Sequence, residues 1–286
     1  MGELIYIPRS NDYPKPSSKH SKKAPSDSSV KSNIEGEETK RLSLKSQPSI
    51  VREEILSLDK NGTESIEQDS ATIANQIDNT ISKTLNSSIP CLYLPYSGGS
   101  SKLLLYFHGN AEDIGLSYEM LDHLRASLKL NVLAVEYPGY GIYEEEDGCD
   151  AEKITQDCDM VYRFVLKEVE NLEERDILLF GRSMGSGPAT YLAANYRPGA
   201  LILMSPYTSI RNVVRSKVGW ALSLMVAEHF DNLKLMSKVV CPTFIVHGQR
   251  DSLIPFTQAQ ELHEQCKGQT FLVLPVEMTH NDFDFY

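Results

Sequence analysis

From Ile89 onward, short apolar runs alternate with stretches whose apolar residues have helical spacing. Several of the short runs are too uniformly apolar to face water, which is typical of strands covered on both faces of a mainly parallel sheet. The pattern therefore predicts an α/β fold with helices on both sides of the sheet. The predicted strands span residues 91–94, 102–107, 131–136, 176–180, 200–204, 243–246 and 270–274.

The chain before Ile89 has a different pattern. Residues 9–88 are rich in Ser, Lys, Glu, Asn and Thr and bury too little apolar surface to offset the entropy of ordering. We therefore predict that residues 1–88 are mostly disordered and that residues 89–286 form one folded domain. Residues 4–7 are β-prone, and the sequence leaves open whether they are an outer strand of the same sheet or part of a tail. Residues 50–58 have helical apolar spacing and predict a transient helix.

Composition narrows the classes of function. The 286 residues carry a formal charge of -11, which argues against general nucleic-acid binding because such binding needs clustered Lys and Arg. The five cysteines are scattered, with no Cys-x-x-Cys pair and no histidine cluster at metal-ligand spacing. We expect reduced thiols, no metal and no nucleotide cofactor.

The sequence also bears on the membrane. It contains no apolar stretch long enough to span a bilayer and no signal peptide at its start, so we expect a cytoplasmic protein. Myristoylation of Gly2 would favour a Ser or Thr at position six, but this chain has Tyr6 there, so the sequence argues against it. A basic cluster could touch an anionic membrane surface or belong to a solvated tail; it consists of Lys15, Lys19, Lys22 and Lys23. No feature predicts an oligomeric state.

A serine lies between two glycines where a predicted strand ends and a helix-prone stretch begins. Residues 181–185 read Gly-Arg-Ser-Met-Gly. Such a turn needs small flanking residues, since the serine backbone is strained and neighbouring chain segments must approach closely to leave its hydroxyl exposed. A Ser-Gly loop without function is the alternative. The strand before it and the helix after it favour Ser183 as a nucleophile.

A serine hydroxyl needs a base to take its proton, and a carboxylate to orient that base. Of the seven histidines, His280 alone directly follows the last predicted strand, which fits the chain order serine, acid, histidine. Asp251 follows the preceding strand and a glycine turn. The alternatives are that His280 is only a surface histidine near the chain terminus and that Asp251 is only a helix cap before Pro255. We predict Ser183, Asp251 and His280 as a catalytic triad.

A tetrahedral intermediate also needs two backbone N–H donors for its oxyanion. The first predicted donor is Met184, directly after the nucleophile. The second is expected in the turn after strand 102–107, where Gly109 lets the backbone curl toward the site. We predict Asn110 as this donor, with Ala111 as the alternative.

Four segments together resemble one known family. They are residues 108–111 (His-Gly-Asn-Ala), 136–141 (Glu-Tyr-Pro-Gly-Tyr-Gly), 181–185 and 280–282 (His-Asn-Asp). Over residues 89–286 the chain resembles the α/β-hydrolase-domain serine hydrolases, and it looks nearest to their depalmitoylating acyl-protein thioesterases. The resemblance implies an α/β-hydrolase fold and hydrolysis of long-chain acyl thioesters on proteins.

One segment could contact the substrate. Residues 213–226 predict a small helical cap segment whose apolar face comprises Val214, Val218, Ala221, Leu222 and Met225. This face is either part of the core or the wall of an acyl-chain pocket. We expect a serine hydrolase that cleaves ester or thioester bonds through an acyl-enzyme, with an acylated protein among its possible substrates. A non-catalytic interaction protein of the same fold, a lipid esterase and a serine peptidase remain the alternatives.

Overall fold

The computed structural model describes residues 2–9, 13, 88–145, 148–218 and 229–282. Several predictions therefore lie outside the described residues. They are the disorder of residues 10–12 and 14–87, the helix at 50–58, the basic cluster at 15–23, and the pocket residues Leu222 and Met225.

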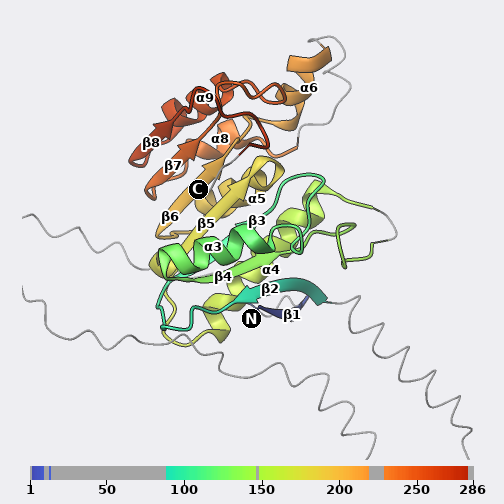
Figure 1. The fold of residues 1–286 in the computed structure, drawn as a ribbon, viewed down its shortest axis with the longest axis vertical. Coiled ribbons are helices and arrows are strands. Elements are labelled where there is room, and N and C mark those ends of the chain that lie inside the picture. The colour runs from blue at the N-terminus through green and yellow to red at the C-terminus, as the bar shows by residue number, and fades with distance from the viewer. Residues whose placement is uncertain (1, 10–12, 14–87, 146–147, 219–228, 283–286) are drawn as a thin grey trace, which may run out of the picture.

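The described chain forms an eight-stranded sheet with the order β1-β2-β4-β3-β5-β6-β7-β8 (Figure 1). β1 pairs antiparallel with β2, and β2 pairs antiparallel with β4. Every later pair is parallel. The strands are β1 Glu3–Pro8, β2 Ser88–Leu94, β3 Leu103–Phe107, β4 Asn131–Val135, β5 Ile177–Arg182, β6 Ala200–Met204, β7 Thr243–Val246 and β8 Thr270–Val273. All seven strands predicted after Ile89 are present, two of them with the predicted ends and the others with ends shifted by at most three residues.

The strand that the sequence left open is β1. Its register places Leu4 opposite Leu92 and Ile7 opposite Ile89, so Ile7 is buried in the same core as Ile89. The polar residues 9–87 therefore lie between two paired strands of one sheet. Closing such a long connection costs little more entropy than closing a short one, because the cost grows only with the logarithm of its length.

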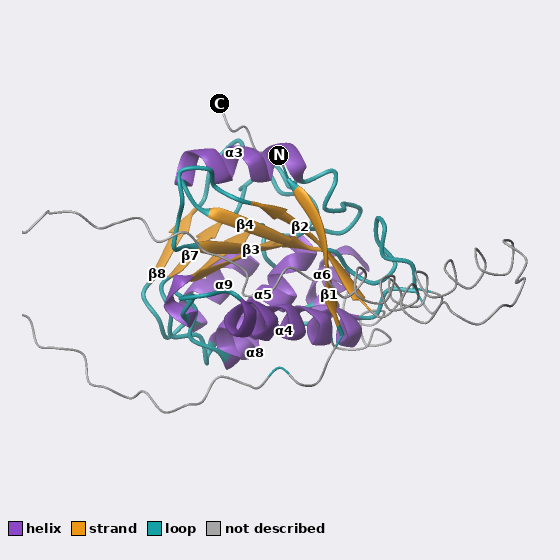
Figure 2. Cartoon of the chain, turned by 90° about the horizontal axis from the view of Figure 1, so that it is seen from below, coloured by secondary structure: helices purple, strands orange, loops and turns teal. Residues whose placement is uncertain are grey.

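Helices lie on both faces of the sheet (Figure 2). α3 covers one face, where Leu121 packs with residues of β2, β3 and β4. α4, α5, α8 and α9 cover the other face and enclose the larger core. The helices are α3 Tyr118–Leu128, α4 Ala151–Glu168, α5 Ser186–Asn195, α6 Ile210–Val218, α8 Asn232–Met236 and α9 Thr257–Gln265, with short 3-10 turns η1 Glu174–Asp176 and η2 Ser183–Gly185.

Double coverage explains why the central strands are so apolar. Every residue of β3 and of β4 is buried. Because the strands from β3 to β8 run parallel, their carboxyl ends lie at one edge of the sheet, where ligands of open α/β sheets bind. The loops after β3, β5, β7 and β8 carry the predicted site residues to that edge.

Candidate active site

Ser183 lies at the end of β5 in a strained turn. Its φ is +48°, in the left-handed region that a residue with a Cβ rarely adopts. Close backbone approach imposes this turn: a Cβ on Gly181 would lie 2.4 Å from the Gly185 carbonyl oxygen, and one on Gly185 would lie 2.0 Å from that of Phe107. Both flanking glycines are therefore required by sterics. The turn holds Ser183 above β5 at the start of η2 and α5.

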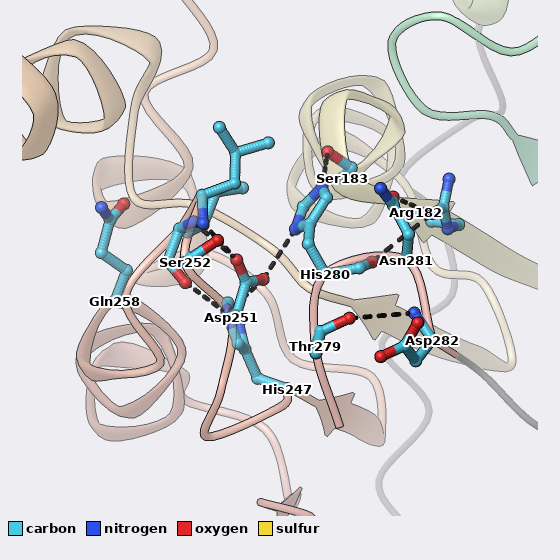
Figure 3. A network of polar contacts seen from close by, with 12 residues as sticks. Arg182, Ser183, His247, Asp251, Ser252, Gln258, Thr279, His280, Asn281 and Asp282 are labelled. Atoms are coloured by element: carbon cyan, nitrogen blue, oxygen red, sulfur yellow. Dashed lines mark hydrogen bonds and ion pairs between the residues drawn. The ribbon is translucent and has the colours of Figure 1, made fainter. Parts of the chain in front are cut away.

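The three predicted triad residues come together (Figure 3). The Ser183 Oγ lies 3.0 Å from the His280 Nε2, and the His280 Nδ1 lies 2.6 Å from the Asp251 Oδ2. The two contacts bridge 97 and 29 residues of sequence. Because Nδ1 faces a carboxylate, it carries the ring proton, and Nε2 is left with a lone pair directed at the serine hydroxyl.

The side chain of Asp251 is fully buried and densely hydrogen-bonded. Its Oδ1 accepts the backbone N–H groups of Leu253 and Ile254, each at 2.8 Å. Burial raises the pKa of Asp251, but hydrogen bonds from His247, His280 and the Ile254 amide lower it by more, so the pKa lies well below its usual range. Asp251 is therefore a carboxylate at neutral pH and can accept a hydrogen bond from the His280 Nδ1.

His247 is a partner of Asp251 that was not among the predicted site residues. It is fully buried, and its Nε2 lies 3.2 Å from the Asp251 Oδ2 and 2.9 Å from the Ile254 carbonyl oxygen. Both neighbours are acceptors, so Nε2 carries the proton and donates it. His247 and Asp251 are four residues apart in the loop after β7, and a histidine that only packs under the loop could have the same spacing, so the sequence alone did not reveal this contact.

The predicted oxyanion donors lie on two loops that meet at Tyr140. The Tyr140 hydroxyl donates to the Asn110 Oδ1 at 2.6 Å and lies 3.8 Å from the Met184 Sδ. Ala111 has a φ of +61°, so the chain turns sharply directly after Asn110. The loop also lies against the serine, because a Cβ on Gly109 would be 3.5 Å from the Ser183 Cβ. The choice between the Asn110 and Ala111 amides stays a prediction.

Arg182 is a second residue whose role the sequence did not reveal. It precedes Ser183, and its side chain is only 4% exposed. Its guanidinium pairs with Glu112 and donates to the Asn281 Oδ1 at 3.1 Å. Burial lowers the pKa of Arg182, while Tyr106 and Asp251 act in the opposite direction. An arginine pKa starts so far above neutral that the side chain stays charged.

The predicted acyl-chain wall is described only in part. Val214 and Val218 lie in α6, where Val214 is half-buried. A separate groove of about 730 Å³ lies beside the loop that follows Ala111. It lies between the β1 and β2 edge of the sheet, the start of α3 and the loop after Tyr140. Its apolar lining comprises Leu4, Leu92, Ile114, Leu116, Tyr118 and Ile142, and its polar lining includes Asp113, Glu119 and Glu136.

Two further observations concern metals and membranes. Within the described ranges, no three His, Cys, Asp or Glu side chains gather as metal ligands would. None of the described helices combines the length and the apolarity that crossing a bilayer requires.

Comparison with known proteins places this geometry. The family described as "Serine aminopeptidase, S33" matches residues 99–238. The chain is 29% identical over 199 residues to alpha/beta hydrolase domain-containing protein 17B of Xenopus tropicalis, covering 69% of this chain and 67% of that protein. It is 28% identical to the Homo sapiens protein of the same name over the same shares.

Solved structures agree on the fold. An acetyl xylan esterase from Paenibacillus sp. R4 superposes with a TM-score of 0.56 at 18% identity, covering 68% of this chain and 75% of that one. The Pyrococcus furiosus esterase Pf2001 gives 0.55 at 19% identity over 68% and 79%. The chain therefore has an α/β-hydrolase fold, and the predicted fold class is confirmed. Within that class it is similar to the alpha/beta hydrolase domain-containing proteins, which confirms the resemblance carried by the four motifs and supports a hydrolase.

Proposed function

We propose that this protein is a serine hydrolase that cleaves acyl esters or thioesters through an acyl-enzyme on Ser183. The observation that carries the proposal is the continuous chain of contacts from the Ser183 hydroxyl through His280 to Asp251, at 3.0 and 2.6 Å. Both distances are within the hydrogen-bond reach that proton transfer requires. The positive φ of Ser183 adds to it, because the strained turn presents the hydroxyl to a substrate.

The proposed reaction has two halves. The Ser183 oxygen attacks the acyl carbonyl carbon while the His280 Nε2 takes the hydroxyl proton, and Asp251 stabilises the resulting imidazolium. Collapse of the tetrahedral intermediate breaks the bond to the leaving alcohol or thiol, which receives the proton from His280. Water then attacks the acyl-enzyme, with His280 again taking and returning a proton, and releases the carboxylic acid and free Ser183. The amides of Met184 and of Asn110 or Ala111 bind the oxyanion in both halves.

For the substrate we propose long-chain acyl thioesters on proteins. The resemblance to depalmitoylating thioesterases supports this class. The groove beside the oxyanion loop adds to that support, because its volume of about 730 Å³ falls in the range of small-molecule sites and six apolar side chains line it. We propose that the acyl chain lies along this groove.

A fluorophosphonate probe tests the reaction class, because only an activated serine reacts with it. We expect the wild type to be labelled and the Ser183→Ala variant not to be. Absence of any labelling that depends on Ser183 would instead favour a non-catalytic interaction protein of the same fold.

Hydrolysis rates for acyl thioesters of graded chain length, short esters and peptides test the substrate class. Leu116 lines the groove and is 72% exposed, so Leu116→Asp should leave the fold intact while raising KM for palmitoyl substrates and sparing acetyl substrates. Leu128→Asp is the matched control, since Leu128 is also exposed and does not line the groove. A preference for acetyl thioesters would exclude the long-chain substrate and keep the hydrolase. A preference for peptides would point to the peptidase activity in the matched family's description.

A further inference from the structure

Arg182 carries a positive charge on a side chain that is almost completely buried. The side chain is 4% exposed and belongs to the residue directly before Ser183. Charged side chains are almost never this buried unless partners compensate for the lost hydration. The positions of those partners therefore indicate what the charge does.

One partner belongs to the loop with the predicted oxyanion donors. The Arg182 Nη1 pairs with the Glu112 Oε1, and the Glu112 Oε2 accepts the Gly109 N–H at 3.1 Å. The loop packs directly on the guanidinium, because a Cβ on Gly109 would lie 2.9 Å from the Arg182 Nη1. Glu112 thus closes the loop around Asn110 and fixes it to the end of β5.

The other partners belong to the loop with His280. The Arg182 Nη2 donates to the Asn281 Oδ1 at 3.1 Å and lies 3.5 Å from the His280 carbonyl oxygen (Figure 3). One planar guanidinium therefore contacts two loops that are about 170 residues apart in sequence, from a position adjacent to the serine. Lysine could not make both sets of contacts, since its ammonium group is a single point on a flexible stem.

We propose that Arg182 is a positioning residue whose guanidinium holds the Gly109–Glu112 loop and the His280 loop in a fixed relation to Ser183. The inference rests on the proposed function, because the oxyanion donors and the base must both stay in place around one acyl carbon. Misplacement of reacting groups by about 1 Å can cost about 10²-fold in rate. Arg182 itself touches no reacting atom.

The test combines amide hydrogen exchange with kinetics on the full chain. In Arg182→Met we expect faster exchange in peptides covering residues 109–112 and 279–282, and a kcat lowered by about 10²-fold with little change in KM. Arg182→Lys should restore protection at residues 109–112 through Glu112 and leave residues 279–282 exchanging fast. The matched control is Arg163→Met, which removes another largely buried ion pair, at 2.9 Å to Asp159 on α4. This control should lower Tm without affecting either loop or kcat at temperatures where it is folded.

Amide hydrogen exchange tests this inference separately from the proposed function, because it reports on the two loops and requires no hydrolysis. If wild type shows no hydrolysis that depends on Ser183, the proposed function fails, while the exchange rates still decide whether Arg182 holds the loops. Unchanged exchange in both loops of Arg182→Met would overturn the inference, as would an equal kcat loss in Arg163→Met. If Arg182→Met does not fold, Asn281→Ala takes its place because Asn281 is exposed. It should speed exchange at residues 279–282 at unchanged Tm, and unchanged exchange there would contradict the proposal.

Discussion

Two histidines in this molecule are each held by a buried carboxylate at almost the same distance, and their surroundings differ. The His280 Nδ1 lies 2.6 Å from Asp251, and the His108 Nε2 lies 2.8 Å from Glu136. Both carboxylates also accept backbone N–H groups, Asp251 from Leu253 and Ile254 and Glu136 from Ile114 and Tyr137. A histidine–carboxylate pair is therefore not by itself a sign of catalysis in this fold.

The two histidines differ in what their second ring nitrogen contacts. In His280 it faces the Ser183 hydroxyl at 3.0 Å, and the side chain is 11% exposed. In His108 it lies 2.9 Å from the Gly109 carbonyl oxygen, and the ring is fully buried and stacked on Tyr137. Neither nitrogen of His108 can accept a proton from a substrate. We infer that the His280 pair transfers protons and that the His108 pair holds the oxyanion loop against β4.

Removing each imidazole should separate these roles most strongly. We expect His280→Ala to lower kcat by about 10⁴-fold or more, since the base is lost. Its loss of stability should be smaller than that of His108→Ala, because Asp251 keeps His247 and the Leu253 and Ile254 amides as partners. His108→Ala leaves the Glu136 carboxylate buried without its partner, which should cost about 3–5 kcal/mol of the free energy of unfolding. Steady-state kinetics and thermal unfolding of both variants measure this crossover. A large loss of stability in His280→Ala with undiminished kcat would contradict the assignment of proton transfer to His280.

The two carboxylates should differ next, by a smaller margin. Asp251→Asn keeps the size of the side chain but favours the wrong tautomer of His280, so we expect kcat to fall by about 10⁴-fold with the serine still in place. Glu136→Gln weakens the hydrogen bonds to a buried ring and should cost about 1–3 kcal/mol of stability. Its kcat should fall less than tenfold by this reasoning, since Glu136 acts on no proton transfer. Equal kcat losses in the two variants would show that the comparison is wrong.

The smallest expected effect is on the pH dependence of stability. The pKa of Asp251 is lower in the folded chain than its usual value of about 3.9, so the native state binds fewer protons than the unfolded state at acidic pH. The resulting stabilisation is fully present above that usual value and is lost as the pH falls toward the lower folded pKa. Urea unfolding at about pH 5 and about pH 3 should therefore show the stability advantage of wild type over Asp251→Asn shrinking at the lower pH. An advantage that grew on acidification would contradict this sign.

Local patterns in the sequence were enough to predict the central sheet and the positions of the triad. The strands after Ile89 are continuous apolar runs between glycine-rich turns, and a parallel sheet brings the ends of β5, β7 and β8 to one edge. Ser183, Asp251 and His280 each directly follow such a strand or its turn. Their meeting therefore follows from topology, although their chemical roles stay predictions.

Contacts between side chains of distant loops could not be predicted in this way. Nothing in the sequence distinguishes Arg182 as buried, because its burial depends on Glu112 and Asn281 arriving from two other loops. His247 after β7 has the same spacing to Asp251 that a packing residue would have. The groove depends on β1 lying beside β2, a pairing across the long polar segment that propensity alone left open.

We propose that the Ser183 oxygen becomes covalently bonded to the acyl group while His280 takes the hydroxyl proton. Rapid quenching of the enzyme with a long-chain acyl thioester, followed by peptide mass spectrometry, tests it directly. We expect the added mass of one acyl group on the peptide that contains Ser183, its absence in Ser183→Ala, and a much slower appearance in His280→Ala. Turnover of the thioester with Ser183 unmodified at every time, or undiminished turnover by Ser183→Ala, would contradict it.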